Sequence, residues 1–281
     1  MRRLLLAGLL IVPVLAAARD DAAALLAKAA SAFERNQRQE MHWNWTAAET
    51  RTLLGNGGVE QKLPDVTVES VIRTDGRRCN AVLSWGDGTT PYLIDSDADS
   101  RCQATEAFRP PFEIAELLKG GKVRVLSHPP EATVLSIVPD TLRQRSTDPE
   151  VSCAASIRAT IQLDPATSFP FQIEGEVAAS GCAATAIVPL HYGTEDFVNT
   201  RRGFGKGAKF RMTFELQPDR FQHPERSFWI RVFERYDMPL VARVGAMVVW
   251  GRRFPLLYGM QRVVKESRTT AREFGAEATM R

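Results

Sequence analysis

The sequence predicts a mainly β protein with a few helices (α+β), built as a curved antiparallel sheet or incomplete β-barrel behind an N-terminal amphipathic helix. Apolar and polar residues alternate over many short segments, which is the period of strands with one buried face. Short turn-forming stretches separate these segments, and this favours antiparallel hairpins over a parallel α/β sheet. One long stretch near the N-terminus has the helical period and no Gly or Pro.

The first residues have the composition of an export signal. Two arginines precede an apolar run over residues 4–15, and three alanines follow at 16–18. We expect cleavage after Ala18, because these alanines supply the small residues at positions −3 and −1 of a cleavage site. The apolar run is too short to span a bilayer of roughly 30 Å. The protein is therefore expected to be periplasmic or secreted, with a signal peptide at residues 1–18.

Loss of this signal leaves the charge nearly balanced. With its two arginines removed, the formal net charge of +3 falls to +1. Such a chain has no overall electrostatic basis for binding nucleic acid, which we exclude as a partner. The remaining chain is long enough to bury a sizeable core. We predict a β half-barrel domain over residues 19–237 and a separate C-terminal segment over 238–281.

The N-terminal half predicts a helix and then several strands. The helix is expected over residues 20–40, with Asp20 or Asp21 as its N-cap. A strand follows, in which Met41, Trp43 and Trp45 alternate with polar residues. Beyond it we expect strands at 66–72 and 79–85, a short helix within 110–121, and a strand pair at 122–127 and 132–138.

The clearest alternation lies in the second half. Residues 151–163 and 169–177 predict a hairpin centred near Ala166, in which the stretch DPATS is the turn. A further strand is expected over residues 208–216, and another over 227–237.

Four cysteines in an exported chain predict two disulfides. In the predicted hairpin, Cys153 and Cys182 come close to facing each other. The turn at residues 86–91 likewise brings Cys79 near Cys102. We therefore predict the pairs Cys79–Cys102 and Cys153–Cys182, each clamping a hairpin.

The C-terminal segment is apolar but interrupted by arginines. Arg243, Arg252 and Arg253 make a membrane-spanning helix implausible. Two alternatives stay open, a hairpin of the same sheet that turns at GRR or a segment in peripheral contact with a membrane surface. The last residues, 269–281, are expected to fray.

One acidic stretch has the spacing of a calcium loop. Three aspartates occupy its positions 1, 3 and 5 and a glutamate occupies position 12, namely Asp95, Asp97, Asp99 and Glu106. Position 6 is Ser100 where the loop requires glycine, and position 8 is the cysteine assigned to a disulfide. A solvated acidic turn is the favoured interpretation, Ca²⁺ is the alternative, and no other cofactor is expected.

The chain carries no catalytic signature. His191, Asp196 and Ser168 could be drawn as a nucleophilic triad, but no G-x-S-x-G elbow accompanies them. We assign no catalytic residue and expect a protein that is not an enzyme. Six aromatic residues are candidates to line a ligand cavity, the alternative being that they fill an ordinary core: Trp43, Trp45, Phe169, Phe171, Phe210 and Phe214.

The helix at 20–40, the strand MHWNWTAAE and the hairpin IQLDPATSFPFQIEGEV together resemble the LolA/LolB-like fold of periplasmic lipoprotein carriers. The resemblance implies an incomplete barrel that wraps helices and holds acyl chains on its concave face. It therefore implies an exported protein that binds a lipid, an acyl chain or a hydrophobic segment, with a lipid or lipidated protein as partner. A secreted structural or interaction module with a closed core, and a hydrolase, are the alternatives.

Overall fold

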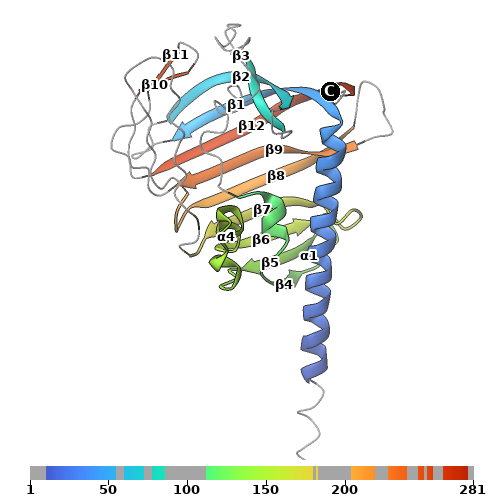
Figure 1. The fold of residues 1–281 in the computed structure, drawn as a ribbon. Coiled ribbons are helices and arrows are strands. Elements are labelled where there is room, and N and C mark those ends of the chain that lie inside the picture. Colours follow the sequence, from blue (N-terminus) through green and yellow to red (C-terminus); the bar gives the residue numbers. More distant parts are fainter. Residues whose placement is uncertain are drawn as a thin grey trace, which may run out of the picture.

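The computed structural model describes residues 11–54, 60–72, 78–85, 112–179, 182, 204–218, 227–238, 246–249, 252–255 and 262–277. Ten strands form one antiparallel sheet: β1 (Trp43–Leu54), β2 (Glu60–Ile72), β3 (Arg78–Trp85), β4 (Lys122–Ser127), β5 (Thr133–Val138), β6 (Ile157–Leu163), β7 (Pro170–Val177), β8 (Lys209–Pro218), β9 (Ser227–Met238) and β12 (Val263–Glu277). Their order is β3-β2-β1-β12-β9-β8-β7-β6-β5-β4, and the sheet does not close (Figure 1). The predicted fold class is confirmed.

The long helix α1 (Ile11–Met41) runs across one face of this sheet (Figure 1). Its buried stripe includes Leu26, Ala29, Phe33 and Asn36, which recur every three or four residues and so share one side of the helix. The helix begins earlier than expected, so Asp20 lies inside it and the predicted N-cap is wrong. No helix in the described part of the chain is long and apolar enough to cross a membrane.

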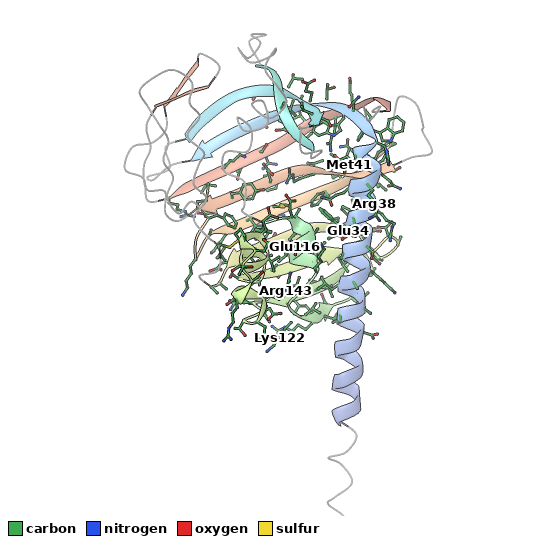
Figure 2. All side chains as sticks on the ribbon, viewed as in Figure 1. Glu34, Arg38, Met41, Glu116, Lys122 and Arg143 are labelled. Carbon is green, nitrogen blue, oxygen red and sulfur yellow. A yellow bond between two sulfur atoms is a disulfide. The ribbon has the colours of Figure 1, made fainter. Side chains whose placement is uncertain are left out.

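Short helices cover the β4–β8 half of the sheet. They are α3 (Ile114–Leu118), the 3₁₀ turn η2 (Arg143–Arg145) and α4 (Pro149–Ala154). In Figure 2, Glu116 of α3 lies near Arg143 of η2, whose Nη2 is 3.4 Å from the Glu116 Oε2. The buried residues of α3, Ile114, Leu117 and Leu118, pack into the same core as α1.

Helix α4 corrects the prediction that a strand begins at residue 151. Asp148 caps this helix, because its Oδ1 accepts hydrogen bonds from the backbone N–H groups of Glu150 (2.8 Å) and Val151 (3.3 Å). Pro149 occupies the first turn, where its missing N–H is not needed. These local signals outweigh the alternating pattern, and β6 begins only at Ile157.

The predicted hairpin is present as β6 and β7. Ile161 lies opposite Ile173 and Ile157 lies opposite Val177. The hairpin is therefore centred on Thr167, one residue beyond the predicted centre at Ala166. Ile157, Ile161 and Ile173 are fully buried. On the next strand, β8, the predicted alternation holds through Phe214 and then ends, because Leu216 is 50% exposed.

The C-terminal segment differs most from expectation. The strand β12 lies between β1 and β9 in the sheet, so the predicted fraying is wrong for residues 269–277, and residues 278–281 lie outside the described part of the chain. The strands β10 (Ala246–Val249) and β11 (Arg252–Pro255) form a hairpin near the predicted turn GRR, but Arg252 and Arg253 lie in β11, with Val249 opposite Arg252. They form their own two-stranded sheet, which corrects the prediction that this hairpin belongs to the main sheet. Peripheral membrane contact through residues 238–281 stays a prediction.

The predicted disulfide Cys153–Cys182 is present, with an S–S distance of 2.08 Å. It links α4 to the chain that follows β7. The expected bridge between two paired strands is therefore a bridge between a helix and the end of the hairpin. Cys102 lies outside the described residues, and the pair Cys79–Cys102 stays a prediction.

Candidate functional site

Five aromatic side chains gather between α1 and the sheet, and we call them the aromatic cluster: Phe33, Phe169, Phe171, Phe214 and Trp229. The Phe169 ring stacks on that of Trp229, with centroids 4.8 Å apart and planes within 5°. It also stacks on Phe33 of α1 at 5.9 Å and meets Phe214 edge-on at 5.5 Å. These separations are those of favourable aromatic pairs, which stabilise a core beyond the area they bury.

The aromatic cluster is closed at its centre and reaches the surface at one end. Phe169 is 1% exposed and Phe214 is 7% exposed, whereas Phe171 and Trp229 are only half-buried. The Phe171 ring lies 6.3 Å from that of Trp229. Leu216, which is 50% exposed, lies directly opposite Trp229 across the β8–β9 ladder and therefore points to the same face.

Asn36 of α1 fixes the helix to the sheet beside this surface. Its Nδ2 donates to the Trp229 carbonyl oxygen and its Oδ1 accepts from the Trp229 N–H, both at 2.8 Å. The β9–β12 ladder ends at the pair Phe233–Arg268, so the first half of β9 has no strand neighbour on this side among the described residues. An amide side chain thus satisfies backbone groups that a strand would otherwise bind.

The same face of the sheet changes character over β1, β12 and β9, where charged side chains replace the aromatic ones. Arg272 of β12 forms an ion pair with Glu40 at the end of α1, and its guanidinium lies 3.5 Å from the Trp45 ring centroid. Burial lowers the pKa of Arg272, although the Glu40 carboxylate opposes this shift. The Arg272 side chain is 7% exposed, and its Nε has no hydrogen-bond partner among the residues that the structure describes.

A second group of charges surrounds Glu234 on β9. Its carboxylate accepts a hydrogen bond from the Tyr236 hydroxyl at 3.0 Å and lies 3.3 Å from Arg231 and 3.6 Å from Lys265. Glu234 raises the pKa of Arg231. A face that holds these ions is a poor surface for an acyl chain, because their desolvation is unfavourable. The apolar part of the inner face is therefore the aromatic cluster and its surroundings.

The six predicted ligand-lining residues lie in different parts of the structure. Phe169, Phe171 and Phe214 meet in the aromatic cluster. Phe210 is buried beside it against Phe112, at 5.3 Å. Trp43 and Trp45 lie on β1 in the charged part of the sheet, and Trp45 contacts Arg272. A ligand-lining role stays a prediction for all six.

Sequence reasoning missed three members of this site, Phe33, Trp229 and Asn36, and placed Phe33 only on the apolar face of the helix. Trp229 lies within the segment predicted as a strand, but its stacking on Phe169 depends on the pairing of β8 with both β7 and β9. Asn36 lies on the helical stripe of Leu26, Ala29 and Phe33, and a polar residue on such a stripe was a signal of a buried hydrogen bond.

The other candidate sites fall mostly outside the described residues. This holds for Asp95, Asp97, Asp99 and Glu106 of the calcium-like stretch, and for His191 and Asp196. Ser168 lies in the loop between β6 and β7. Within the part of the chain that the structure describes, no three His, Cys, Asp or Glu residues lie close enough together to hold a metal ion.

No protein-family model matches the chain, and no curated protein matches it. Among solved structures it matches a domain described as an outer membrane lipoprotein-sorting protein from Vibrio parahaemolyticus, at 11% identity and a TM-score of 0.39, over 90% of this chain and 95% of that one. It matches a DUF1329 family protein from Desulfovibrio piger at 8% identity and 0.40, over 89% and 93%. A LolA superfamily protein from Nitrosomonas europaea matches at 9% identity and 0.33, over 92% and 94%.

Proposed function

We propose that this is an exported, non-enzymatic carrier-type protein that holds an acyl chain or hydrophobic segment of a lipid or lipidated protein between α1 and the aromatic cluster. The observation that carries the proposal is the apolar surface at the open end of the cluster, formed by Phe171, Leu216 and Trp229. Contiguous apolar surface of this kind is typical of a binding site, and single exposed apolar residues are not.

The way α1 covers the cluster supports the same proposal. Several of its buried residues are alanines, namely Ala22, Ala29 and Ala32, and these bury little apolar area each. Its larger contacts in the cluster region are Leu26, Phe33 and the Asn36 hydrogen bonds. We propose that the part of α1 around Phe33 moves away from the sheet when ligand binds, and that the ligand chain then replaces its contacts with Phe169 and Trp229.

The proposed location is the periplasm or the extracellular space. The disulfide Cys153–Cys182 is typical of proteins from oxidising compartments. The N-terminal residues have the composition of an export signal, as described above.

The proposal is tested by titrating the delipidated protein with a fluorescent fatty acid. We expect saturable binding and a raised melting temperature, because a ligand that binds only the folded state stabilises it. Leu216→Ser and Phe171→Ser should weaken this binding. Leu142→Ser is the matched control, because Leu142 is 77% exposed and lies beside η2, outside the aromatic cluster. Absence of saturable binding, or equal loss in all three variants, would contradict the proposal.

A secreted interaction module with a closed core is the second candidate. It is favoured by the near-complete burial of Phe169 and Phe214 and by their contacts with Phe33, which leave the centre of the cluster filled. This candidate predicts no fatty-acid binding and an unchanged melting temperature in the same titration.

A further inference from the structure

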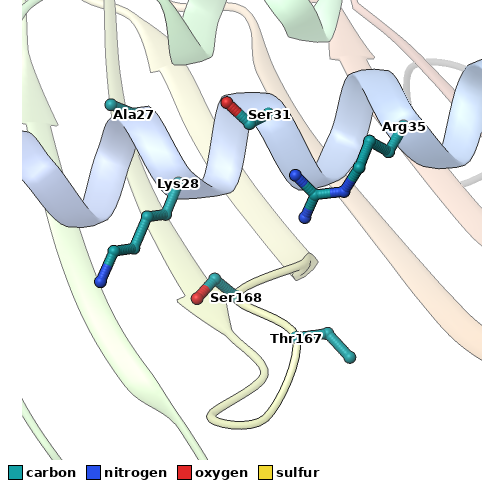
Figure 3. A pocket seen from close by; sticks show the side chains of 6 residues that line it. All are labelled: Ala27, Lys28, Ser31, Arg35, Thr167 and Ser168. Carbon is teal, nitrogen blue, oxygen red and sulfur yellow. The ribbon is translucent and has the colours of Figure 1, made fainter.

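A polar pocket lies beside α1, on the side of the loop that joins β6 and β7. This pocket of about 410 Å³ is lined by Ala27, Lys28, Ser31 and Arg35 of α1 and by Thr167 and Ser168 of the loop. Lys28 and Arg35 are seven residues apart and so project from the same side of the helix. Figure 3 shows both side chains extending from α1 toward the loop, with Ser168 between them.

The pocket has an excess of positive charge. Its lining includes two cations and no carboxylate, and within the described part of the chain neither Lys28 nor Arg35 forms an ion pair. By contrast, Arg38 on the next turn pairs with Glu34 at 3.9 Å. The acidic residue of the loop, Asp164, does not line the pocket. Its Oδ1 accepts hydrogen bonds from the N–H and hydroxyl of Thr167, at 2.7 and 2.6 Å.

Ser168 supplies a hydroxyl group from an unfavourable backbone conformation. Its φ of 60° lies in the left-handed region, where glycine is preferred. The Ser168 hydroxyl has no hydrogen-bond partner among the described residues. It therefore remains available to donate to a ligand in the pocket.

The pocket is connected to the aromatic cluster through the loop between β6 and β7. Phe169 follows Ser168 in the sequence, and its ring stacks on those of Trp229 and Phe33. On α1, Phe33 projects toward the sheet, from the side of the helix opposite to Ser31 and Arg35. The chain of a ligand with its anionic end in the pocket would therefore pass the β6–β7 loop to reach the half-buried Trp229 ring, which stacks on Phe169 at 4.8 Å.

We propose that the pocket binds the anionic headgroup, a phosphate or carboxylate, of an amphiphile whose acyl chain lies against the aromatic cluster. This inference rests on the proposed function and names the chemical class of its ligand. Lys28 and Arg35 would donate charge-assisted hydrogen bonds to the anionic oxygens, and Ser31 and Ser168 would add hydroxyl donors.

The test compares dodecyl phosphate, dodecanol and inorganic phosphate as ligands of the full chain, measured by calorimetry. We expect dodecyl phosphate to bind roughly tenfold or more tightly than dodecanol, which lacks the charge. The double variant Lys28→Ala/Arg35→Ala should reduce its affinity to that of dodecanol. Arg38→Gln is the matched control, because Arg38 is an exposed cation of the same helix outside the pocket.

Ser168→Gly provides a variant that cannot fail by unfolding through backbone strain, because glycine accepts a positive φ. It should bind dodecyl phosphate more weakly while its melting temperature stays equal or rises. Unchanged affinity in the glycine variant would remove Ser168 from the site.

The outcomes separate this inference from the proposed function. Equal affinity for dodecyl phosphate and dodecanol, unchanged in the double variant, would overturn the headgroup site and leave the apolar site standing. Inorganic phosphate that binds as tightly as dodecyl phosphate would identify a free anion as the ligand and overturn the headgroup assignment. Absence of binding by both amphiphiles would overturn the proposed function as well.

Discussion

Asn36 of α1 binds both backbone polar groups of Trp229 on β9, with two hydrogen bonds of 2.8 Å. At Trp229, β9 is no longer paired with β12. The Asn36 side chain therefore satisfies the N–H and carbonyl groups that a paired strand would otherwise bind. Two residues further along β9, the Thr269 hydroxyl has a similar role, because it donates to the Arg231 carbonyl oxygen at 3.3 Å. Helix α1 is therefore bonded into a gap in the sheet as well as packed on its face.

Replacement of Asn36 by Ala should destabilise the protein. Both hydrogen bonds would be lost and the Trp229 groups left poorly satisfied, so we expect a loss of about 1–3 kcal/mol in urea unfolding. Gln37→Ala, at the neighbouring helix position, is the control and should change stability little. If α1 moves to admit ligand, Asn36→Ala should also speed fatty-acid association in stopped-flow measurements. An unfolding free energy equal to wild type would show that these hydrogen bonds contribute nothing net.

Gly175→Ala should destabilise the hairpin core. A methyl group at Gly175 would lie 2.4 Å from Cζ of Phe210, which is buried and cannot easily move. Overpacking of this kind costs about 1–3 kcal/mol, measurable by thermal or urea unfolding. Gly275→Ala is the matched control, because its nearest neighbour would be the Asn44 carbonyl oxygen at 3.6 Å, an ordinary contact. Equal effects of the two substitutions would contradict the packing of Phe210 over Gly175.

Loss of the disulfide should lower stability substantially. Cys153→Ala/Cys182→Ala removes a cross-link between residues 29 apart, and we expect a loss of about 2–4 kcal/mol. Each single variant should lose a similar amount, because one thiol cannot form the bridge. Each variant should have a lower melting temperature than the wild type, and reduction of the wild-type protein should lower it by a similar amount. Unchanged melting temperatures in the variants and in the reduced protein would contradict a structural role for this disulfide.

Arg272 and Glu40 should behave as a coupled pair. Arg272→Met leaves the largely buried Glu40 carboxylate without its partner, so it should cost about 3–5 kcal/mol. Adding Glu40→Gln to that variant should recover part of the loss, because no unpaired charge remains. A double-mutant cycle measures this coupling, and strictly additive effects would show that the two side chains do not interact.

Removal of β12 should abolish the cooperative fold. A chain ending at Arg262 loses the strand that joins β1 to β9, and we expect no cooperative thermal transition. A chain ending at Glu277 retains every residue of β12 that pairs with β1 or β9 and should unfold as the full chain does. Normal melting of the shorter chain would show that the two halves of the sheet are independent.

The alternating segments determined much of the fold. The strands at 122–127, 132–138 and 209–214 have one apolar face each, and such a face can be buried only on one side of a sheet. The hairpin of β6 and β7 was predicted together with its buried residues. The predicted pairing of its strands in turn led to the prediction of the disulfide Cys153–Cys182. These features depend on local sequence and short loops, so one sequence is enough to predict them.

Two elements were misread because local pattern and tertiary context disagree. At residues 149–154 the alternation is that of a strand, but the cap formed by Asp148 and Pro149 starts a helix. In β12, charged residues such as Lys265 and Arg272 point inward, where Glu234 and Glu40 from distant parts of the chain neutralise them. A strand whose inward side chains are charged and form ion pairs has no alternating apolar pattern, so the pattern alone cannot predict it.

Periodicity, turn residues and nearby cysteines are enough to predict a β-rich chain with an N-terminal helix, its hairpins and one disulfide. Only the tertiary structure decided that the C-terminal strand enters the sheet between β1 and β9 and that Phe33, Phe169 and Trp229 meet under α1. It also placed Lys28 and Arg35 beside Ser168. Each of these contacts joins residues far apart in the chain, and only the packing of the whole fold fixes which of them meet.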